Sequence, residues 1–235
     1  NGNLQNWDPN PNNVINALAL KDTTVLVGGN FSGIGGKFVY RFAPVSKTTG
    51  IPVANFVNFN NNVNTISVSG DSILIGGNFT ESAYYTTYSA NLNSTTGVPD
   101  VIKFPYTNSS IYTVISDGSG GYFVGGSFTQ FGSFSRSYIA KMNSAFQVDA
   151  SFVTTLNGSV RSMALIGNTL YIGGDFTVCN GVSRAHLSAL NTSNGTNKTW
   201  NGTTNNDVYA MTTDGTNIYA GGTFTLINGA TTRNR

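Results

Sequence analysis

Few side chains in this sequence could act as an acid, a base or a nucleophile. Its 235 residues include one histidine, His186, and one cysteine, Cys179. Catalysis by either residue needs a tuned partner within a few ångströms, and no motif supplies one. His186 aligns with aromatic residues elsewhere in the chain, Tyr40, Tyr88 and Tyr138. Cys179 aligns with Phe131 and Ile227. We therefore expect His186 to replace an aromatic strand residue, and Cys179 to be a small buried hydrophobe.

Carboxylates are equally scarce and are spread along the chain. Four aspartates fall where tight turns are expected, at Asp22, Asp71, Asp117 and Asp214, and aspartate is favoured in turns for its geometry alone. The segment 117–121 resembles part of a calcium loop but lacks the spaced carboxylates and the final glutamate. Two carboxylates for glycoside hydrolysis would have to converge from separate parts of the chain. We expect no catalytic residue, no metal site and no cofactor.

Arginine and asparagine show patterns of their own. Arg136, Arg184 and Arg233 recur at intervals of 48 and 49 residues, with Arg41 near the same phase. Repetition favours a structural role, such as bonding carbonyl groups between repeats, over anion capture. Nine Asn-x-Ser/Thr motifs could accept glycans in a eukaryotic secretory route. They lie at Asn30, Asn78, Asn93, Asn108, Asn157, Asn191, Asn194, Asn197 and Asn201.

Charge and hydropathy exclude two classes of partner. The chain has 12 basic and 10 acidic residues, and no basic stripe could follow a phosphate backbone. No apolar run approaches the roughly 20 residues of a membrane span. We expect neither nucleic-acid binding nor membrane insertion. A surface rich in Asn, Thr, Ser and Gly favours an extracellular or cell-surface location.

One repeated phrase, Gly-Gly-x-Phe-Ser/Thr, occurs five times. It indicates which structural elements position the residues named above. The first glycines are Gly28, Gly76, Gly125, Gly173 and Gly221, separated by 48, 49, 48 and 48 residues. Such a period is typical of a repeat protein in which each unit buries its apolar face against its neighbours. Glycine at this point lets chains approach closely at a bend or bulge.

Each unit reads as several short strands. A short apolar run precedes each Gly-Gly, as in 169–172, and a turn and a further strand precede that run, which indicates a tight hairpin. A third strand follows, as in 185–190. A fourth segment carries an aromatic residue at constant phase, Trp7, Phe56, Phe104, Phe152 and Trp200. Both aromatic registers are expected to pack between units, with a ligand cage as the alternative.

Four strands in about 48 residues match one blade of a β-propeller. We predict an all-β chain in which residues 1–235 form a single β-propeller domain, or a fragment of one, with five blades if it closes on itself. A β-solenoid is the less favoured alternative, because its repeats are shorter. The last unit ends before its third strand, so a longer natural polypeptide with six or seven blades stays open.

The fourth unit resembles the delta-60 repeat. The residues that carry the resemblance are Tyr171 to Thr177, Asn180-Gly181, Arg184, Leu187, Leu190-Asn191 and Asn194-Gly195, with Asp149 to Phe152 before them. Similar repeats occur in large secreted bacterial surface proteins and in a fungal cortical-marker family. The resemblance covers essentially the whole chain and implies a propeller-like extracellular module without a catalytic assignment. It supplies no binding residues.

Function is expected where loops depart from the repeat. The clearest departures carry aromatic residues, Tyr84, Tyr85, Phe131 and Phe134, which suit stacking on sugar rings or contact with a protein. Ordinary loop packing is the alternative for all four. The sequence favours a non-enzymatic binding or adhesion module of a larger surface protein, with a glycan or protein partner. A structural spacer and a glycan-active enzyme are the other hypotheses.

Overall fold

The computed structural model describes residues 7–53, 57–80, 87–99, 104–229 and 231–232. The chain divides into two compact units, Asn1–Ile102 and Lys103–Arg235, and each is described by itself. Strands, turns and bends make up the regular structure of the described residues, without a helix. No helix long and apolar enough to cross a membrane occurs among them. The all-β prediction is confirmed.

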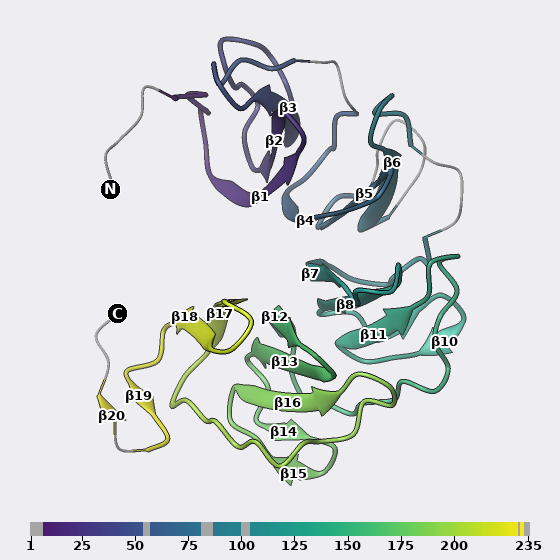
Figure 1. Ribbon diagram of the computed structural model, residues 1–235, viewed down its shortest axis with the longest axis vertical. Helices are drawn as coiled ribbons and strands as arrows, with labels where there is room; N and C mark the ends of the chain where they lie inside the picture. The colour runs from purple at the N-terminus through teal and green to yellow at the C-terminus, as the bar shows by residue number, and fades with distance from the viewer. Residues whose placement is uncertain (1–6, 54–56, 81–86, 100–103, 230, 233–235) are drawn as a thin grey trace. The chain divides into compact units, whose positions relative to one another are not determined.

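The first unit contains two antiparallel sheets of three strands each (Figure 1). The first sheet consists of β1 (Ile15–Lys21), β2 (Thr24–Gly29) and β3 (Phe42–Ser46). The second consists of β4 (Val63–Ser69), β5 (Ser72–Gly77) and β6 (Ser89–Asn93). In both, the middle strand is the one that ends in Gly-Gly. The two sheets are therefore two copies of one module.

The second unit continues the same module in three further sheets. The first holds β7 (Ile111–Ser116), β8 (Tyr122–Gly126) and β11 (Ile139–Met142). The second holds β12 (Val160–Ile166), β13 (Thr169–Gly174) and β16 (Leu187–Asn191). The last pairs β17 (Val208–Thr213) with β18 (Ile218–Gly222).

Short two-stranded ribbons come directly after the second strand of each sheet in this unit. They are β9 (Gln130–Phe131) with β10 (Phe134–Ser135), β14 (Val178–Cys179) with β15 (Val182–Ser183), and β19 (Leu226–Ile227) with β20 (Thr231–Thr232). In the first repeat this ribbon shrinks to a single bridge between Ile34 and Lys37. These ribbons occupy the stretch that the sequence indicated only as a loop.

The predicted hairpins between first and second strands are confirmed. Three close with two-residue loops that begin at Asp22, Gly70 and Gly167, each with a positive φ. The other two loops are longer and are organised by an aspartate. The Asp117 carboxylate accepts hydrogen bonds from the backbone N–H groups of Ser119 and Gly121, and Asp214 accepts those of Thr216 and Asn217. Turn geometry therefore accounts for these two aspartates.

The fourth segment of each repeat is not a full strand. It reaches the third strand through one isolated bridge per repeat, Val45 to Pro52, Leu92 to Pro99, Met142 to Val148 and Leu190 to Asn197. Proline lacks the N–H group that a ladder needs, and the turns before three of these segments contain Gly50, Gly97 and Gly195 with positive φ. Four of the sheets accordingly have three strands where the sequence predicted four, and the last has two among the described residues.

Two close approaches explain the Gly-Gly pairs that begin at Gly28, Gly125 and Gly173. A Cβ at Gly28, Gly125 or Gly173 would lie 2.5 to 2.7 Å from Cγ1 of a valine in the next repeat, Val63, Val160 or Val208. A Cβ on the second glycine would collide with the carbonyl oxygen of the residue just before its own first strand, as at Gly174 with Ser159. In these three pairs only glycine fits both positions without displacing the neighbouring backbone or side chain.

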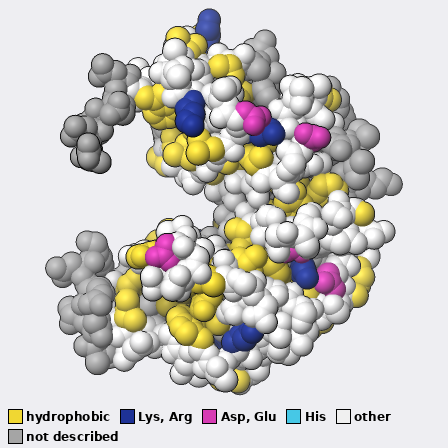
Figure 2. Space-filling model, viewed as in Figure 1, with side chains coloured by type: hydrophobic (Ala, Val, Ile, Leu, Met, Phe, Trp, Pro, Cys, Tyr) yellow, Lys and Arg dark blue, Asp and Glu magenta, His cyan; other side chains and the backbone are white. Residues whose placement is uncertain are grey.

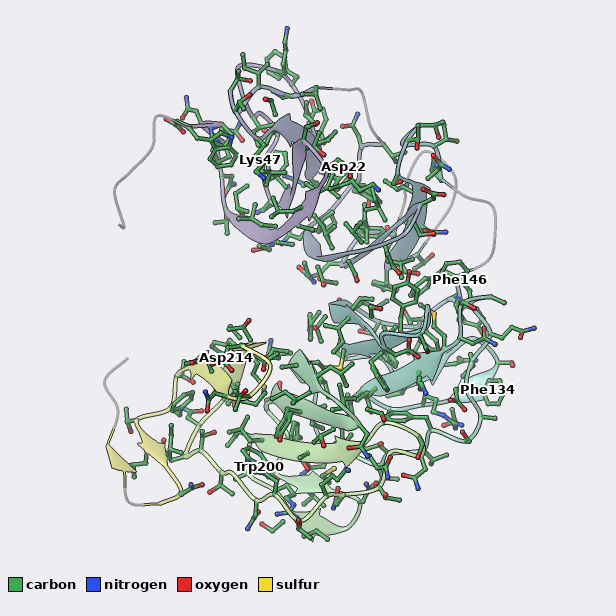
Figure 3. All side chains as sticks on the ribbon, in the orientation of Figure 1. Asp22, Lys47, Phe134, Phe146, Trp200 and Asp214 are labelled. Carbon is green, nitrogen blue, oxygen red and sulfur yellow. The ribbon has the colours of Figure 1, made fainter. Side chains whose placement is uncertain are left out.

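The core follows the phenylalanine of the repeated phrase. Phe31, Phe79, Phe128, Phe176 and Phe224 are all at most 6% exposed. The second aromatic register varies more: Phe152 is fully buried against Phe123 (ring centroids 5.4 Å apart), whereas Trp200 packs on Tyr171 and is 37% exposed. The Trp200 side chain is labelled in Figure 3. Phe56 lies outside the described residues. The first register is therefore buried in all five repeats and the second is buried at Phe152 and only partly at Trp200, while packing between units stays a prediction.

An asparagine clamp, which the sequence analysis missed, holds the end of the phrase in every repeat. Its side-chain Nδ2 donates to the hydroxyl of the Ser or Thr, and its Oδ1 accepts the N–H group of that residue. The five asparagines are Asn12, Asn60, Asn108, Asn157 and Asn205. Two of them, Asn108 and Asn157, were expected as possible glycan acceptors, but their amide nitrogens are already engaged in the clamp.

Entry into the third strand uses a residue with positive φ. Tyr88, Tyr138 and His186 share this conformation and the same backbone hydrogen bonds, which confirms that His186 takes the place of an aromatic residue. In the first repeat the equivalent residue is Arg41, with φ 71°. The predicted alignment of Tyr40 with this position is wrong by one residue, because the stretch from the first glycine to this position is one residue shorter in the second repeat than in the other three.

Candidate binding site at the bulges of the first strands

Each first strand contains one bulge at the same point. The register shifts by one residue at Asn16, Asn64, Tyr112, Arg161 and Tyr209. A bulged residue is released from the ladder, so its side chain is aimed differently from its neighbours. These positions recur at the repeat spacing, yet their residue types differ. The bulge is therefore a place where the side chain changes while the fold stays constant.

In the second unit, three bulge residues from successive sheets stack on one another. The guanidinium carbon of Arg161 lies 5.2 Å from the ring centroid of Tyr112 and 5.3 Å from that of Tyr209. Both distances are within the range of a cation–π interaction. We call Tyr112, Arg161 and Tyr209 the Tyr–Arg–Tyr stack.

Two aspartates fix the polar ends of the stack. Arg161 Nη2 lies 3.0 Å from Asp175 Oδ2, and the Asp175 carboxylate also accepts the N–H group of Ser159. The Tyr209 hydroxyl donates to Asp207 Oδ2 at 3.3 Å. Asp175 is the variable residue of the Gly-Gly-x-Phe phrase, so the phrase itself places a carboxylate beside the bulge.

His186 joins the cluster from the preceding sheet. Its Nδ1 lies 3.3 Å from Asp207 Oδ1 and 3.3 Å from the carbonyl oxygen of Gly174. The His186 side chain is 14% exposed and that of Asp207 is 23% exposed. The pair connects the third strand of one repeat to the loop before the first strand of the next, and thereby holds Tyr209 in place.

The stack stays accessible although it is ordered. The Arg161 side chain is 34% exposed and Tyr209 is 48% exposed. In the first unit the equivalent positions hold short amides with internal bonds: Asn16 donates to the carbonyl oxygen of Val63, and Asn64 donates to Asn78. Within the described residues, the large accessible bulge side chains therefore belong to the second unit.

The sequence-derived loop aromatics are not brought together as one site. Tyr84 and Tyr85 lie outside the described residues. Phe131 is fully buried against Phe104 and Phe128, so its ring is a core side chain that no ligand reaches. Phe134, labelled in Figure 3, lies on β10 beneath the Arg136 guanidinium at 5.3 Å and is partly exposed.

The recurring arginines bond carbonyl groups, as the repetition indicated. Arg136 donates to the carbonyl oxygen of Ala150 at 3.1 Å, and Arg184 donates to that of Lys198 at 3.3 Å. Both acceptors lie in the segment that leads to the next repeat. Arg233 lies outside the described residues. Arg41 instead bonds carbonyls of its own repeat, Asn30 and Phe31.

Cys179 is fully buried, as predicted. Burial raises the pKa of its thiol, and Sγ donates to Asn197 Oδ1 at 3.1 Å. A protonated and inaccessible thiol is a poor nucleophile. Cys179 shares its bridging position with Phe131 and Ile227, so it serves as part of the core.

A recess of ≈400 Å³ lies beside the beginning of β8 and the end of β11. It adjoins the segment 117–121 that resembles part of a calcium loop. Asp117 and Asp149 both line it, together with Lys141. The Asp117 carboxylate bonds its own turn, and Lys141 Nζ lies 3.5 Å from Asp149. Across the described part of the chain, no group of three His, Cys, Asp or Glu side chains could hold a metal ion.

Comparisons with known proteins identify the fold that these repeats form. Neither a protein-family model nor a curated protein matches the chain. Solved structures do match. The WD40 domain of Pan2 from Neurospora crassa is similar over 84% of this chain and 54% of its own, with a TM-score of 0.51 and 8% identity. The fold is that of a β-propeller.

Two further solved structures are similar to this chain over most of its length. The WD40 β-propeller domain of Doa1 is similar over 88% of this chain and 74% of its own, with a TM-score of 0.50 and 10% identity. The computationally designed Ika4 protein is similar over 80% of this chain and 98% of its own, with a TM-score of 0.52 and 14% identity. The repeats described above are thus propeller blades, and the bulges lie on the first strand of each blade.

Proposed function

We propose that this propeller is a non-enzymatic binding module that recognises a protein partner through the Tyr–Arg–Tyr stack. The observation that carries the proposal is the stack itself, three large bulge side chains from successive blades held together and still accessible. Propellers present such positions on a rigid scaffold, and function on a scaffold resides where residues vary.

The residue types favour a protein ligand. Tyrosine and arginine are enriched among the few interface residues that carry most of the binding energy. Here the Arg161 guanidinium is already ordered by two rings and by Asp175, so little side-chain entropy is lost when a partner docks. The half-exposed ring of Tyr209 offers apolar area, and the 34% exposed guanidinium of Arg161 offers hydrogen-bond donors.

A glycan is the second candidate ligand, because the 48% exposed ring of Tyr209 could also stack on the apolar face of a sugar. With either ligand, we propose an extracellular or cell-surface location within a larger adhesive protein. The low charge and the resemblance to secreted repeats support this location. The alternative hypothesis is a structural spacer that binds no ligand, and the binding experiment distinguishes it from a binding module.

The test uses a peptide array and a glycan array probed with the purified chain. Arg161→Ala and Tyr209→Ala should each weaken binding by about tenfold or more, as loss of a central Tyr or Arg contact does. Tyr40→Ala is the matched control, since Tyr40 is 46% exposed in the other unit. Ligands on the peptide array alone support a protein partner, and ligands on the glycan array alone replace it with a glycan. Binding that ignores both stack variants, or no ligand on either array, would overturn the site.

A further inference from the structure

A second recess lies in the second unit, between its first two blades. Its volume is ≈280 Å³. One side is the segment 135–137, which starts at the end of β10, and the other is the segment 153–156, which leads to β12. Among the described residues that line it, only Arg136 is charged, and the others are serines, threonines, a valine and a leucine. The wall therefore offers one positive charge, several hydroxyl groups and a small apolar surface.

The Arg136 guanidinium is held in place but is not neutralised. It lies over the Phe134 ring, 5.3 Å from the ring centroid (Figure 3), and donates to the carbonyl oxygens of Ser135 and Ala150. Within the described part of the chain no carboxylate pairs with it, since the nearest in sequence, Asp149, pairs with a lysine. Figure 2 shows few charged side chains on the face in view. An ordered arginine without a counterion is a ready site for an anion.

The next blade shows what fits beside this arginine. The equivalent residue there, Arg184, donates through Nη1 to Oδ1 of Asn201. Asn201 is the equivalent of Val153, because each directly follows the aromatic residue of the fourth segment. Valine has no acceptor atom, so Arg136 lacks the partner that Arg184 has. The chain thus places an oxygen atom beside this arginine in one blade and leaves a recess in the other.

Hydrogen-bond donors remain for a ligand in this recess. Arginine has five N–H groups. Arg136 uses one on Nη1 and one on Nη2 for the two carbonyl groups, and its Nε is buried without a partner. One N–H group on each Nη is left, which serves two oxygen atoms. The hydroxyl groups of Ser135 and Ser137 also line the recess, without a hydrogen bond to another described residue.

We propose that this recess binds an acidic sugar, a hexuronic acid, through its carboxylate. The carboxylate accepts charge-assisted hydrogen bonds from Arg136, and the ring hydroxyls reach Ser135 and Ser137. The 49% exposed side chain of Val153 contacts the apolar face of the ring. A volume of ≈280 Å³ is just below the roughly 300–1,000 Å³ of pockets for larger ligands, so it suits one sugar unit. This site is separate from the Tyr–Arg–Tyr stack and does not depend on the proposed function.

NMR titration of the ¹⁵N-labelled full chain with glucuronate tests the proposal. Glucuronate should shift the signals of the segments 135–137 and 153–156. It should bind about tenfold or more tightly than glucose, which lacks the carboxylate. Acetate carries a carboxylate without the ring and should bind more weakly than glucuronate. Equal binding of glucose would overturn the role of the arginine, and equal binding of acetate would overturn the sugar as the ligand.

Val153→Asn is the decisive variant, because it supplies the internal acceptor that the next blade already has. The new amide oxygen should occupy Arg136 and weaken glucuronate binding about tenfold or more. Val98→Asn is the matched control, since Val98 is also 49% exposed and does not line the recess. Its binding should equal that of the wild type.

Two further variants locate the site. Arg136→Gln should lose glucuronate binding, and circular dichroism checks that this chain is folded. Arg161→Ala removes the centre of the stack and should leave glucuronate binding unchanged. Binding that survives Val153→Asn, or that is lost in Arg161→Ala, would overturn the recess as the site.

Discussion

The asparagine clamp shows how one side chain can order a repeat. Asn157 makes three hydrogen bonds, donating to the hydroxyl of Thr177 and accepting the N–H groups of Thr177 and Val178. These bonds connect the loop before the first strand to the end of the second strand. The same arrangement in all five repeats makes it a general device of this chain.

We predict that Asn157→Ala lowers the free energy of unfolding by about 1–3 kcal/mol, because two backbone donors lose their acceptor. Asn157→Asp keeps the accepting oxygen and loses only the amide donor, so it should be less destabilising. Urea denaturation monitored by tryptophan fluorescence measures both. Equal losses in the two variants would contradict the assignment of the acceptor as the main contribution.

At the level of strands and sheets, the two glycines of each phrase have different roles. The second glycine sits against the carbonyl oxygen just before its own first strand, and the first glycine of three phrases, at Gly28, Gly125 and Gly173, sits against the next blade. Gly221 has no such neighbour among the described residues. The chain thus contains an internal control for the contribution of blade packing.

We predict that Gly125→Ala destabilises the chain by about 1–3 kcal/mol, the range for overpacking a core. Its new Cβ would lie 2.7 Å from Val160 Cγ1 and 2.8 Å from Thr113 Cγ2. Gly221→Ala should be neutral or slightly stabilising, since nothing opposes its Cβ and the unfolded chain loses entropy. Thermal unfolding at low protein concentration compares them, and a similar loss in both would contradict the packing role of Gly125.

The repeated phrase was sufficient to predict the hairpins, the buried phenylalanines and the propeller fold. Its glycines mark the points where two segments of the chain come close together, and its phenylalanines mark positions in the hydrophobic core. It was not sufficient to predict the fourth segment, since an aromatic at constant phase says nothing about ladder bonds that residues such as Pro52 and Pro99 cannot donate. The bulge site was missed because its members differ in type. Asn16, Tyr112 and Arg161 show no common chemistry in sequence, and their equivalence emerges only from the shifted register.

The chain as a whole has few titratable groups, so its response to acid depends on a small number of them. Burial, the largest influence, raises the pKa of the Asp149 carboxyl, but hydrogen bonds from Ser151 and the charge of Lys141 outweigh it and hold the pKa below its ordinary value of 3.8. Hydrogen bonds from Asn217, Thr216 and Tyr219 likewise lower the pKa of Asp214. Both carboxylates are stabilised in the folded state.

We predict that the free energy of unfolding falls on acidification below about pH 4. A depressed folded-state pKa gives stability that is present above the unfolded pKa and is lost as pH falls through the folded one. Asp149→Asn should flatten this fall, and Ser151→Ala should flatten it less. Urea midpoints measured across the acid range provide the test, and an unchanged slope in Asp149→Asn would refute the assignment.

The buried thiol of Cys179 has a practical consequence. Because it is the sole cysteine, fully buried and bonded to Asn197, a thiol reagent in solution reaches it only when the fourth blade opens. The rate of its modification therefore records the frequency of that opening. The modification rate of Cys179 thus reports local unfolding of the fourth blade without an added label. Any bound ligand that makes this opening rarer would lower the rate.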